Sequence, residues 1–222
     1  MSYFTAEFLK FFRGLKKNNS KAWFDANKER YETEVKKPFA AFVEEMLTRL
    51  RAEDTTLAIS AKEAIFRINR DIRFSKDKRP YKEHMAANIS SGGRANHEEP
   101  GFYLQFGADR MMIGGGAYML ENENLYKVRK TIIKNLDAFA ALLQDKSFKQ
   151  KYGSLQGEKN KALPGEFKEY AGKQPLVANK QFYYMAELEA GTILKKNLPD
   201  FLMQYYLAGK TMNDFLKRAM KG

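Results

Sequence analysis

Apolar residues recur with a helical period near both ends of this 222-residue chain, and with a period of two in its middle. Thr5 can cap a first N-terminal helix, and a longer amphipathic helix follows, in which Pro38 should cause a kink or a restart. The apolar positions of these two helices are Phe8, Phe11, Phe12, Leu15, Val35, Phe39, Phe42, Val43, Met46, Leu47 and Leu50. The N-terminal part is therefore predicted to be helical.

The C-terminal half also follows a helical pattern. Residues 125–143 predict one helix of about six turns. Two final helices follow, the first stopping at Gly209 and the second capped by Thr211. Residues 145–180 predict short helices and loops, whereas residues 181–190 suit a strand or a helix equally.

The middle of the chain reads as strands. From Ile65 to Phe74 the residues alternate, which predicts a half-buried strand with Phe74 on the core face. Arg70 falls on that same face, so it needs a carboxylate partner, a cleft or a bulge. Further strands are predicted at residues 57–60, 85–90, 102–106 and 111–118.

This order of elements predicts an α+β fold, with a mostly antiparallel central sheet flanked by N-terminal and C-terminal helices. We expect a single domain over residues 1–222. Its helical ends would be residues 1–53 and 121–222, around a strand-rich middle at residues 55–120.

Composition narrows the classes of function. The chain has a net charge of +12, and residues 62–82 contain eight basic and three acidic side chains. This excess favours anionic partners. The absence of cysteine excludes disulfides and thiolate chemistry. The sequence has neither an apolar signal segment nor a membrane span, so we expect a cytoplasmic protein without a membrane partner.

The densest charge lies in a strand–turn motif from Arg67 to Lys82, with seven basic and two acidic residues among sixteen. Arginine forks suit phosphate and carboxylate groups, so we expect a small anionic ligand here. At ~3.3 Å per residue, Arg67 and Arg73 would lie ~20 Å apart on one strand face. The workable pairs are therefore Arg67 with Asn69, or Arg73 with Asp71. The candidate ligand-binding residues of the motif are Arg67, Asn69, Arg70, Asp71, Arg73, Lys76, Lys78, Tyr81 and Lys82.

A glycine run at residues 114–116 interrupts a predicted strand. Glycines there indicate a bulge, or the close approach of another backbone or of a ligand, which makes Gly115 a further candidate. The run has neither the ending of a P-loop nor the spacing of a dinucleotide-binding turn.

Other chemistry has weaker support in the sequence. His84 and His97 lack the spaced partners of a metal site, so we expect no metal and no cofactor. A general base is conceivable at Asp71, Asp77, Glu83 or His84, although Asp71 suits pairing with an arginine better. No pattern assigns a reaction, and whether the protein is an enzyme stays open.

The motif resembles the signature of a family described only as a conserved hypothetical, domain of unknown function 2461. The residues that carry the resemblance are Arg67, Arg70-Asp71, Arg73-Phe74, Lys76-Asp77-Lys78 and Pro80-Tyr81-Lys82. Further similar segments are Asn18-Asn19, Trp23-Phe24, Tyr31, Gly101-Phe102-Tyr103-Leu104, Gly114-Gly115-Gly116 and Leu163-Pro164-Gly165. The resemblance implies a site role for Arg129 as well. It brings no established activity, and Leu120-Glu121 stands where a proline is expected.

Three functions are compatible with these patterns. The first is a protein that binds or acts on a small phosphorylated or carboxylated ligand at the motif. The second is a nucleic-acid-binding protein in which Tyr81 or Tyr103 stacks on bases. The third is an interaction module that docks an acidic partner. A purely structural ion-pair network would produce the same residue pattern. The sequence does not fix the oligomeric state.

Overall fold

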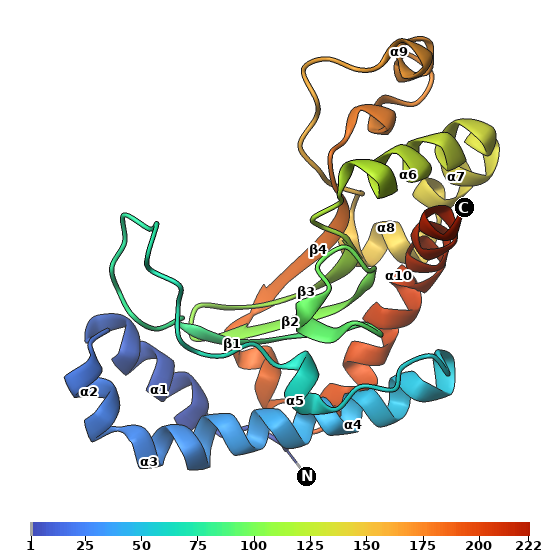
Figure 1. The fold of residues 1–222 in the computed structure, drawn as a ribbon. Helices are drawn as coiled ribbons and strands as arrows, with labels where there is room; N and C mark the ends of the chain where they lie inside the picture. The colour runs from blue at the N-terminus through green and yellow to red at the C-terminus, as the bar shows by residue number, and fades with distance from the viewer. Residues whose placement is uncertain (1) are drawn as a thin grey trace. The chain divides into compact units, whose positions relative to one another are not determined.

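The computed structural model describes residues 2–222 and confirms the α+β class. Four strands form one antiparallel sheet in the order β1-β2-β3-β4 (Figure 1). They are β1 (His84–Ile89), β2 (Gly101–Gly107), β3 (Arg110–Ala117) and β4 (Phe182–Glu189). The longer helices are α1 (Ala6–Lys17), α2 (Lys21–Ala26), α4 (Lys37–Glu53), α6 (Asn122–Lys134), α7 (Leu136–Gln144), α8 (Lys146–Tyr152), α9 (Gly165–Ala171) and α10 (Leu198–Lys221).

Shorter helical turns complete the chain. They are α3 (Lys28–Tyr31), the π-helix η1 (Glu32–Lys36), α5 (Ala61–Ala64), and the 3-10 turns η2 (Gly93–Ala95), η3 (Pro175–Ala178) and η4 (Ala190–Leu194). The described chain groups into two compact units. The first comprises the described residues up to 95, with 103–113 and 187–203, and the second comprises residues 96–102, 114–186 and 204–222.

Aromatic packing builds the core of the first unit. The ring of Phe106 in β2 lies 5.5 Å from the rings of Phe4, Phe39 and Phe42. Edge-to-face and tilted contacts of this kind add to the gain from burying apolar area. They fix α4 and the entry to α1 against one face of β2.

The start signal of the first helix acts as predicted. The Thr5 side chain accepts a hydrogen bond from the Glu7 backbone N–H at 3.2 Å. The helix α4 begins at Lys37, after η1, so Pro38 occupies its first turn. The backbone is already helical through η1 and at Lys36, so Pro38 follows a change from π-helix to α-helix and not a new helix start.

The strand predicted over residues 65–74 is wrong. Only two isolated antiparallel bridges form there, from Ile65 to Ala87 and from Asn69 to Tyr81. The rest is a loop between α5 and β1, which Figure 1 shows in teal beside α1 and α2. Phe74, predicted on the core face, is 96% exposed.

Local hydrogen bonds explain why this segment is not a strand. The carboxylates of Asp71 and Asp77 each accept the backbone N–H of the residue two positions on, at 3.2 Å for Arg73 and 3.0 Å for Arg79. Such turns compete with strand pairing for the backbone donors. The aspartates therefore fold the chain into turns where the alternation of side chains predicted extension.

Residues 57–60 are also not a strand. Leu57 and Ile59 are buried, but their carbonyls accept hydrogen bonds from the Arg51 side chain of α4, at 3.1 and 2.7 Å. An arginine thus replaces the strand partner that the alternation predicted.

The second unit is built around the fully buried Tyr184 of β4, which settles residues 181–190 as mainly strand. Its hydroxyl donates to the Gly209 carbonyl at 3.0 Å. A Cβ on Gly209 would lie 2.3 Å from that hydroxyl, so glycine makes room for the ring. It does not end a helix: α10 is continuous, and the prediction of two final helices is wrong.

The single helix predicted over residues 125–143 is also wrong. It divides into α6 and α7 at Asn135, whose φ of −134° leaves the helical region. The Asn135 side chain donates to the Thr131 carbonyl at 2.8 Å, which satisfies one of the last carbonyls of α6. Among residues 2–222, no helix is long and apolar enough to cross a membrane.

Candidate functional site

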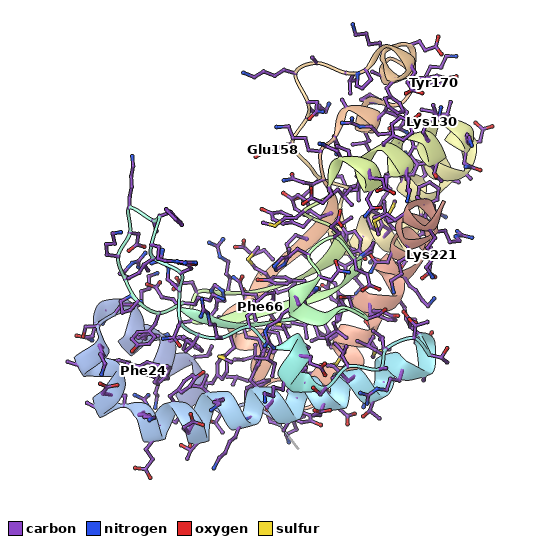
Figure 2. All side chains as sticks on the ribbon, in the orientation of Figure 1. Phe24, Phe66, Lys130, Glu158, Tyr170 and Lys221 are labelled. Atoms are coloured by element: carbon purple, nitrogen blue, oxygen red, sulfur yellow. The ribbon has the colours of Figure 1, made fainter. Side chains whose placement is uncertain are left out.

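The loop between α5 and β1 has a tip (residues 70–79) and a base (residues 66–69 and 80–84). Tyr81 anchors the base: it is 7% exposed, and its ring stacks on Phe24 of α2 at 4.1 Å (Figure 2 labels Phe24). The side chain of Asn19 grips the Tyr81 backbone twice, donating to the carbonyl at 3.0 Å and accepting from the N–H at 3.1 Å. Tyr81 is therefore a packing residue, and its ring is not available for a base or a ligand.

Arg70 has the partner that its position requires. Its Nη1 donates to Asp77 Oδ2 at 2.7 Å and to the Arg79 carbonyl at 3.1 Å. About a quarter of the side chain is exposed, so the pair is not sealed in a core. The expectation of a partner is confirmed, and the pair ties the two ends of the tip together.

Asp77 neutralises a second arginine. Arg79 donates to it from Nε at 2.9 Å and from Nη2 at 2.7 Å, and it also pairs with Glu83. The hydrogen bonds from Arg79, and then those from Arg70, hold the pKa of Asp77 well below its usual range. Such a carboxylate is a poor proton acceptor near neutral pH, which weakens Asp77 as a general base.

Asp71 and Arg73 form a further ion pair. Arg73 Nε donates to Asp71 Oδ1 at 3.0 Å, and Arg73 Nη2 donates to Asp71 Oδ2 at 2.7 Å. The Arg73 hydrogen bonds lower the pKa of Asp71 to about 2. The Arg73 guanidinium also lies 5.9 Å from the ring of Phe74. Lys78 donates to the Ile72 carbonyl at 3.0 Å. The pairing of Asp71 with Arg73 is as predicted, and it leaves few free cations at the tip.

Lys76 is the exception at the tip. It is exposed, and within residues 2–222 it has no ion pair. Asn69, at the base, is likewise exposed and takes part in the bridge to Tyr81 through its backbone.

The base carries two cations of a different kind. Arg67 is exposed and Lys82 is half-buried, and across the described chain neither has a carboxylate within ion-pair distance. The Lys82 Nζ lies 5.2 Å from the centre of the Phe66 ring, which Figure 2 labels beside the strands. Burial, and then the nearby Arg67 charge, lower the pKa of Lys82. These two neighbouring cations repel each other, although the Asp71 carboxylate is near enough to Arg67 for their charges to interact.

Two further groups of the sheet adjoin these cations. His84, at the start of β1, is half-buried, and burial and then the Lys82 charge lower its pKa to about 4. Tyr103 of β2 lies 6.4 Å from Phe66, and its hydroxyl donates to Gln105 at 2.8 Å. Burial raises the pKa of Tyr103 to about 12. Phe66, Arg67, Lys82, His84 and Tyr103 are together called the Lys82 cluster below.

A small pocket of about 130 Å³ adjoins the cluster at His84 and Gln105. The basic residues that line it are already paired with carboxylates, and Lys16 is paired with one that also lines the pocket. Lys16 pairs with Asp109 at 2.5 Å, and Arg110 pairs with Glu187 at 2.8 Å. Ligand pockets for larger molecules measure about 300–1,000 Å³, so this one holds only a group of a few atoms.

Gly115, a candidate from the glycine run, lies in the second unit. A Cβ there would approach the Gly101 carbonyl oxygen to 2.6 Å and the Tyr184 hydroxyl to 2.5 Å. Close approach of protein atoms thus accounts for this glycine. Of the alternatives predicted for the glycine run, the structure favours close approach of another part of the chain over close approach of a ligand.

Arg129 also belongs to the second unit and is 4% exposed. Its Nη2 donates to the Asn179 carbonyl at 3.0 Å, and its guanidinium lies 5.8 Å from the ring of Phe167. Within the described chain its Nε has no hydrogen-bond acceptor, nor does the buried side-chain amide of Asn179 have a partner. Burial lowers the pKa of Arg129. The structure therefore gives this residue a packing environment and leaves its site role a prediction.

No group of three or more histidine, cysteine, aspartate or glutamate side chains comes together within residues 2–222 to hold a metal.

The sequence analysis did not predict that Phe66 and Gln105 lie beside the candidate site, or that Asn19 binds the Tyr81 backbone. For Phe66 and Gln105, the sequence pattern could have indicated it. Phe66 belongs to the alternation over residues 65–74, and Gln105 stands with Tyr103 on the polar face of β2. Asn19 had no such signal apart from the family resemblance, because nothing in an isolated Asn-Asn pair shows which distant backbone it binds.

The sequence model of the family described as "Conserved hypothetical protein (DUF2461)" matches residues 7–215. This chain belongs to DUF2461. The match confirms the resemblance carried by the loop motif and covers both compact units. No curated protein matches this DUF2461 chain.

Proposed function

We propose that this DUF2461 protein binds a small phosphorylated or carboxylated molecule at Arg67 and Lys82. The observation that carries the proposal is this pair of neighbouring cations at the base of the loop, neither of which has a carboxylate within ion-pair distance in the described chain. Two like charges held close together repel each other. An anion bound between them would remove this repulsion and accept a charge-assisted hydrogen bond from each cation. The three arginines of the tip have no such need, because Asp71, Asp77 and Glu83 already neutralise them.

The surroundings of Lys82 strengthen a bound anion. The ammonium is partly withdrawn from water beside Phe66, and electrostatic attraction is stronger where the local dielectric is low. The anchoring of Tyr81 fixes the neighbouring backbone, so a ligand would not have to order this segment.

Inorganic phosphate is the simplest probe, measured by calorimetry or by chemical-shift titration. Two charge-matched variants serve as the comparison: R67Q/K82Q at the base and R73Q/K76Q at the tip. We expect the base variant to lose at least about tenfold in affinity, since hydrogen bonds to charged groups contribute ~1.5–3 kcal/mol each. The tip variant should bind phosphate almost as the wild type does. Equal losses in both variants would mean that the affinity reflects net charge alone and would overturn the proposal.

A single-stranded nucleic acid is the second candidate, favoured by one observation. Phe74 is 96% exposed at the basic tip, with the Arg73 guanidinium beside its ring. Exposed aromatics next to cations can stack on bases. Fluorescence anisotropy with a labelled single strand at two salt concentrations tests this. Binding that falls steeply with salt and is lost in F74A would support the nucleic-acid function, and no binding at physiological salt would exclude it.

A further inference from the structure

Arg129 of α6 is the one charged residue that lies buried within residues 2–222, at 4% exposed. Burial lowers its pKa, and no neighbouring charge contributes to that shift. An arginine keeps its proton in a protein, so it cannot become neutral as a buried lysine or histidine can. A buried guanidinium therefore requires a counter-charge.

Protein contacts meet this requirement only in part. The Arg129 Nη2 donates to the Asn179 carbonyl at 3.0 Å, and the guanidinium lies 5.8 Å from the centre of the Phe167 ring. A carbonyl and a ring face attract a cation, but neither has a full negative charge. The Arg129 Nε is buried and, within the described chain, has no acceptor. One donor and the charge of this side chain are thus left for a bound group.

Asn179 adds two more unpartnered atoms on the residue that Arg129 contacts. It is 1% exposed, and in residues 2–222 neither its Nδ2 nor its Oδ1 has a hydrogen-bond partner. Its backbone is held by the bridge to Lys159 and by a hydrogen bond from its N–H to the Leu176 carbonyl at 2.9 Å. Gly157 lies against the amide, since a Cβ there would be 2.8 Å from Nδ2. A buried amide without partners is costly, so these atoms also indicate a bound group.

We propose that Arg129 and Asn179 bind a small monovalent oxyanion that carries a hydroxyl group, with bicarbonate as the simplest example. The Arg129 Nε–H and the Asn179 Nδ2–H donate to the oxygens of the ion, and its hydroxyl donates to Asn179 Oδ1. One negative charge balances one guanidinium, whereas a doubly charged ion would leave a net charge buried. This inference is independent of the proposed function, which concerns the loop of the first unit.

Other small groups meet fewer of these requirements. A water molecule satisfies the hydrogen bonds of both side chains but leaves the guanidinium charge without a counter-charge. Chloride and acetate supply the charge and accept from the two N–H groups, but neither has a hydrogen to donate to Asn179 Oδ1. The three buried atoms and the one charge together therefore favour the hydroxyl-bearing oxyanion.

Equilibrium denaturation in urea tests this inference on the full-length protein. Unfolding and refolding let every molecule take up the ion although the site is buried, and urea adds no anion of its own. Stability is measured in bicarbonate, acetate and chloride at a slightly alkaline pH, with a bulky sulfonate salt keeping the ionic strength constant. An ion that binds only the folded protein raises the free energy of unfolding as its concentration rises. We expect acetate and chloride to need at least about tenfold higher concentration than bicarbonate for the same rise.

Three variants assign the effect to this site. N179A should fold, because the Asn179 side chain has no hydrogen bond to lose within the described chain, and it should need at least about tenfold more bicarbonate. R129M should lose the bicarbonate effect altogether, while its stability without bicarbonate stays equal to the wild type or rises. K130Q is the matched control on the same helix. Lys130, labelled in Figure 2, pairs with Glu166 at 2.9 Å, and its loss should leave the bicarbonate effect unchanged.

The NMR signals of the Arg129 Nε–H and the Asn179 amide should shift when bicarbonate is added. If stability rises while these signals stay fixed, the ion binds elsewhere and the proposal is wrong. It is also wrong if none of the three ions raises stability, or if N179A and K130Q respond equally. A response to chloride as strong as that to bicarbonate, lost in N179A, would overturn the oxyanion class. R67Q/K82Q should keep the full response, so failure at the loop and failure here are told apart.

Discussion

The tip and the base of the same loop carry the same kinds of basic side chain in different electrostatic settings. At the tip, Arg70, Arg73 and Arg79 are each closed by carboxylates within a few residues. At the base, the charges of Arg67 and Lys82 act on each other, and in the described chain neither has a carboxylate within ion-pair distance. A high density of charge in a sequence therefore does not by itself locate a binding site. Charge that the fold leaves uncompensated is the better guide.

The aromatic residue of the base is buried and that of the tip is exposed. This difference gives the largest expected effect on stability. Tyr81→Ala should lower the free energy of unfolding by roughly 3–5 kcal/mol, because it removes a buried ring stacked on Phe24. Phe74→Ala, at the tip, is the matched control and should leave stability unchanged, since that ring is 96% exposed. Chemical denaturation measures both. A comparable loss of stability in the two variants would show that the tip is packed as the base is, contrary to the difference between them.

The half-buried His84 of the base gives an acid-dependent effect of intermediate size on stability. The folded pKa of His84 is about 4, below the ordinary value of about 6.5, so the unfolded chain binds the proton first as the pH falls. The stability contribution is complete above about pH 6.5 and is lost between there and about pH 4, to an extent of roughly 2–3 kcal/mol.

An NMR titration of the His84 imidazole, together with denaturation curves at several pH values, measures this effect. His84→Asn should flatten the loss of stability between pH 6.5 and pH 4 and change little above pH 7. If the imidazole of the wild type titrates near 6.5, the base is not desolvated, and the argument for strong anion binding there is wrong.

The smallest effect concerns the ion pairs of the tip. Asp77→Ala should hardly change the melting temperature, because exposed ion pairs contribute little to stability. It should instead speed hydrogen exchange of the Arg79 amide, which loses its acceptor. Phosphate affinity at the base should stay unchanged. A large fall in melting temperature, or a loss of phosphate binding, would show that tip and base act as one functional unit.

The sequence predicted those parts of the fold that depend on periodicity. Strands expected at residues 85–90, 102–106 and 111–118 correspond to β1, β2 and β3 within one or two residues. The alternation at residues 65–74 failed because Asp71 and Asp77 compete for backbone donors, which periodicity does not register. Gly209 failed as a helix stop because its role is set by Tyr184, a residue distant in sequence.

The candidate site could be located in the sequence only as far as the motif. The need of Arg70 for a partner was predictable, because an unpaired arginine on an apolar face is costly. The pairing of Asp71 with Arg73 was predicted, but the pairing of Asp77 was not, since it depends on turns that bring Asp77 back to Arg70 and Arg79. The contact of Lys82 with Phe66 joins residues far apart in the sequence, and periodicity does not register such contacts.

A crystal structure of the protein grown in phosphate tests most directly whether a small anion binds at the base of the loop. We expect one phosphate in contact with the Arg67 guanidinium and the Lys82 ammonium, with the carboxylate pairs of Arg70 and Arg73 intact. A phosphate bound instead to Arg73 and Lys76 at the tip, with the base empty, would contradict it.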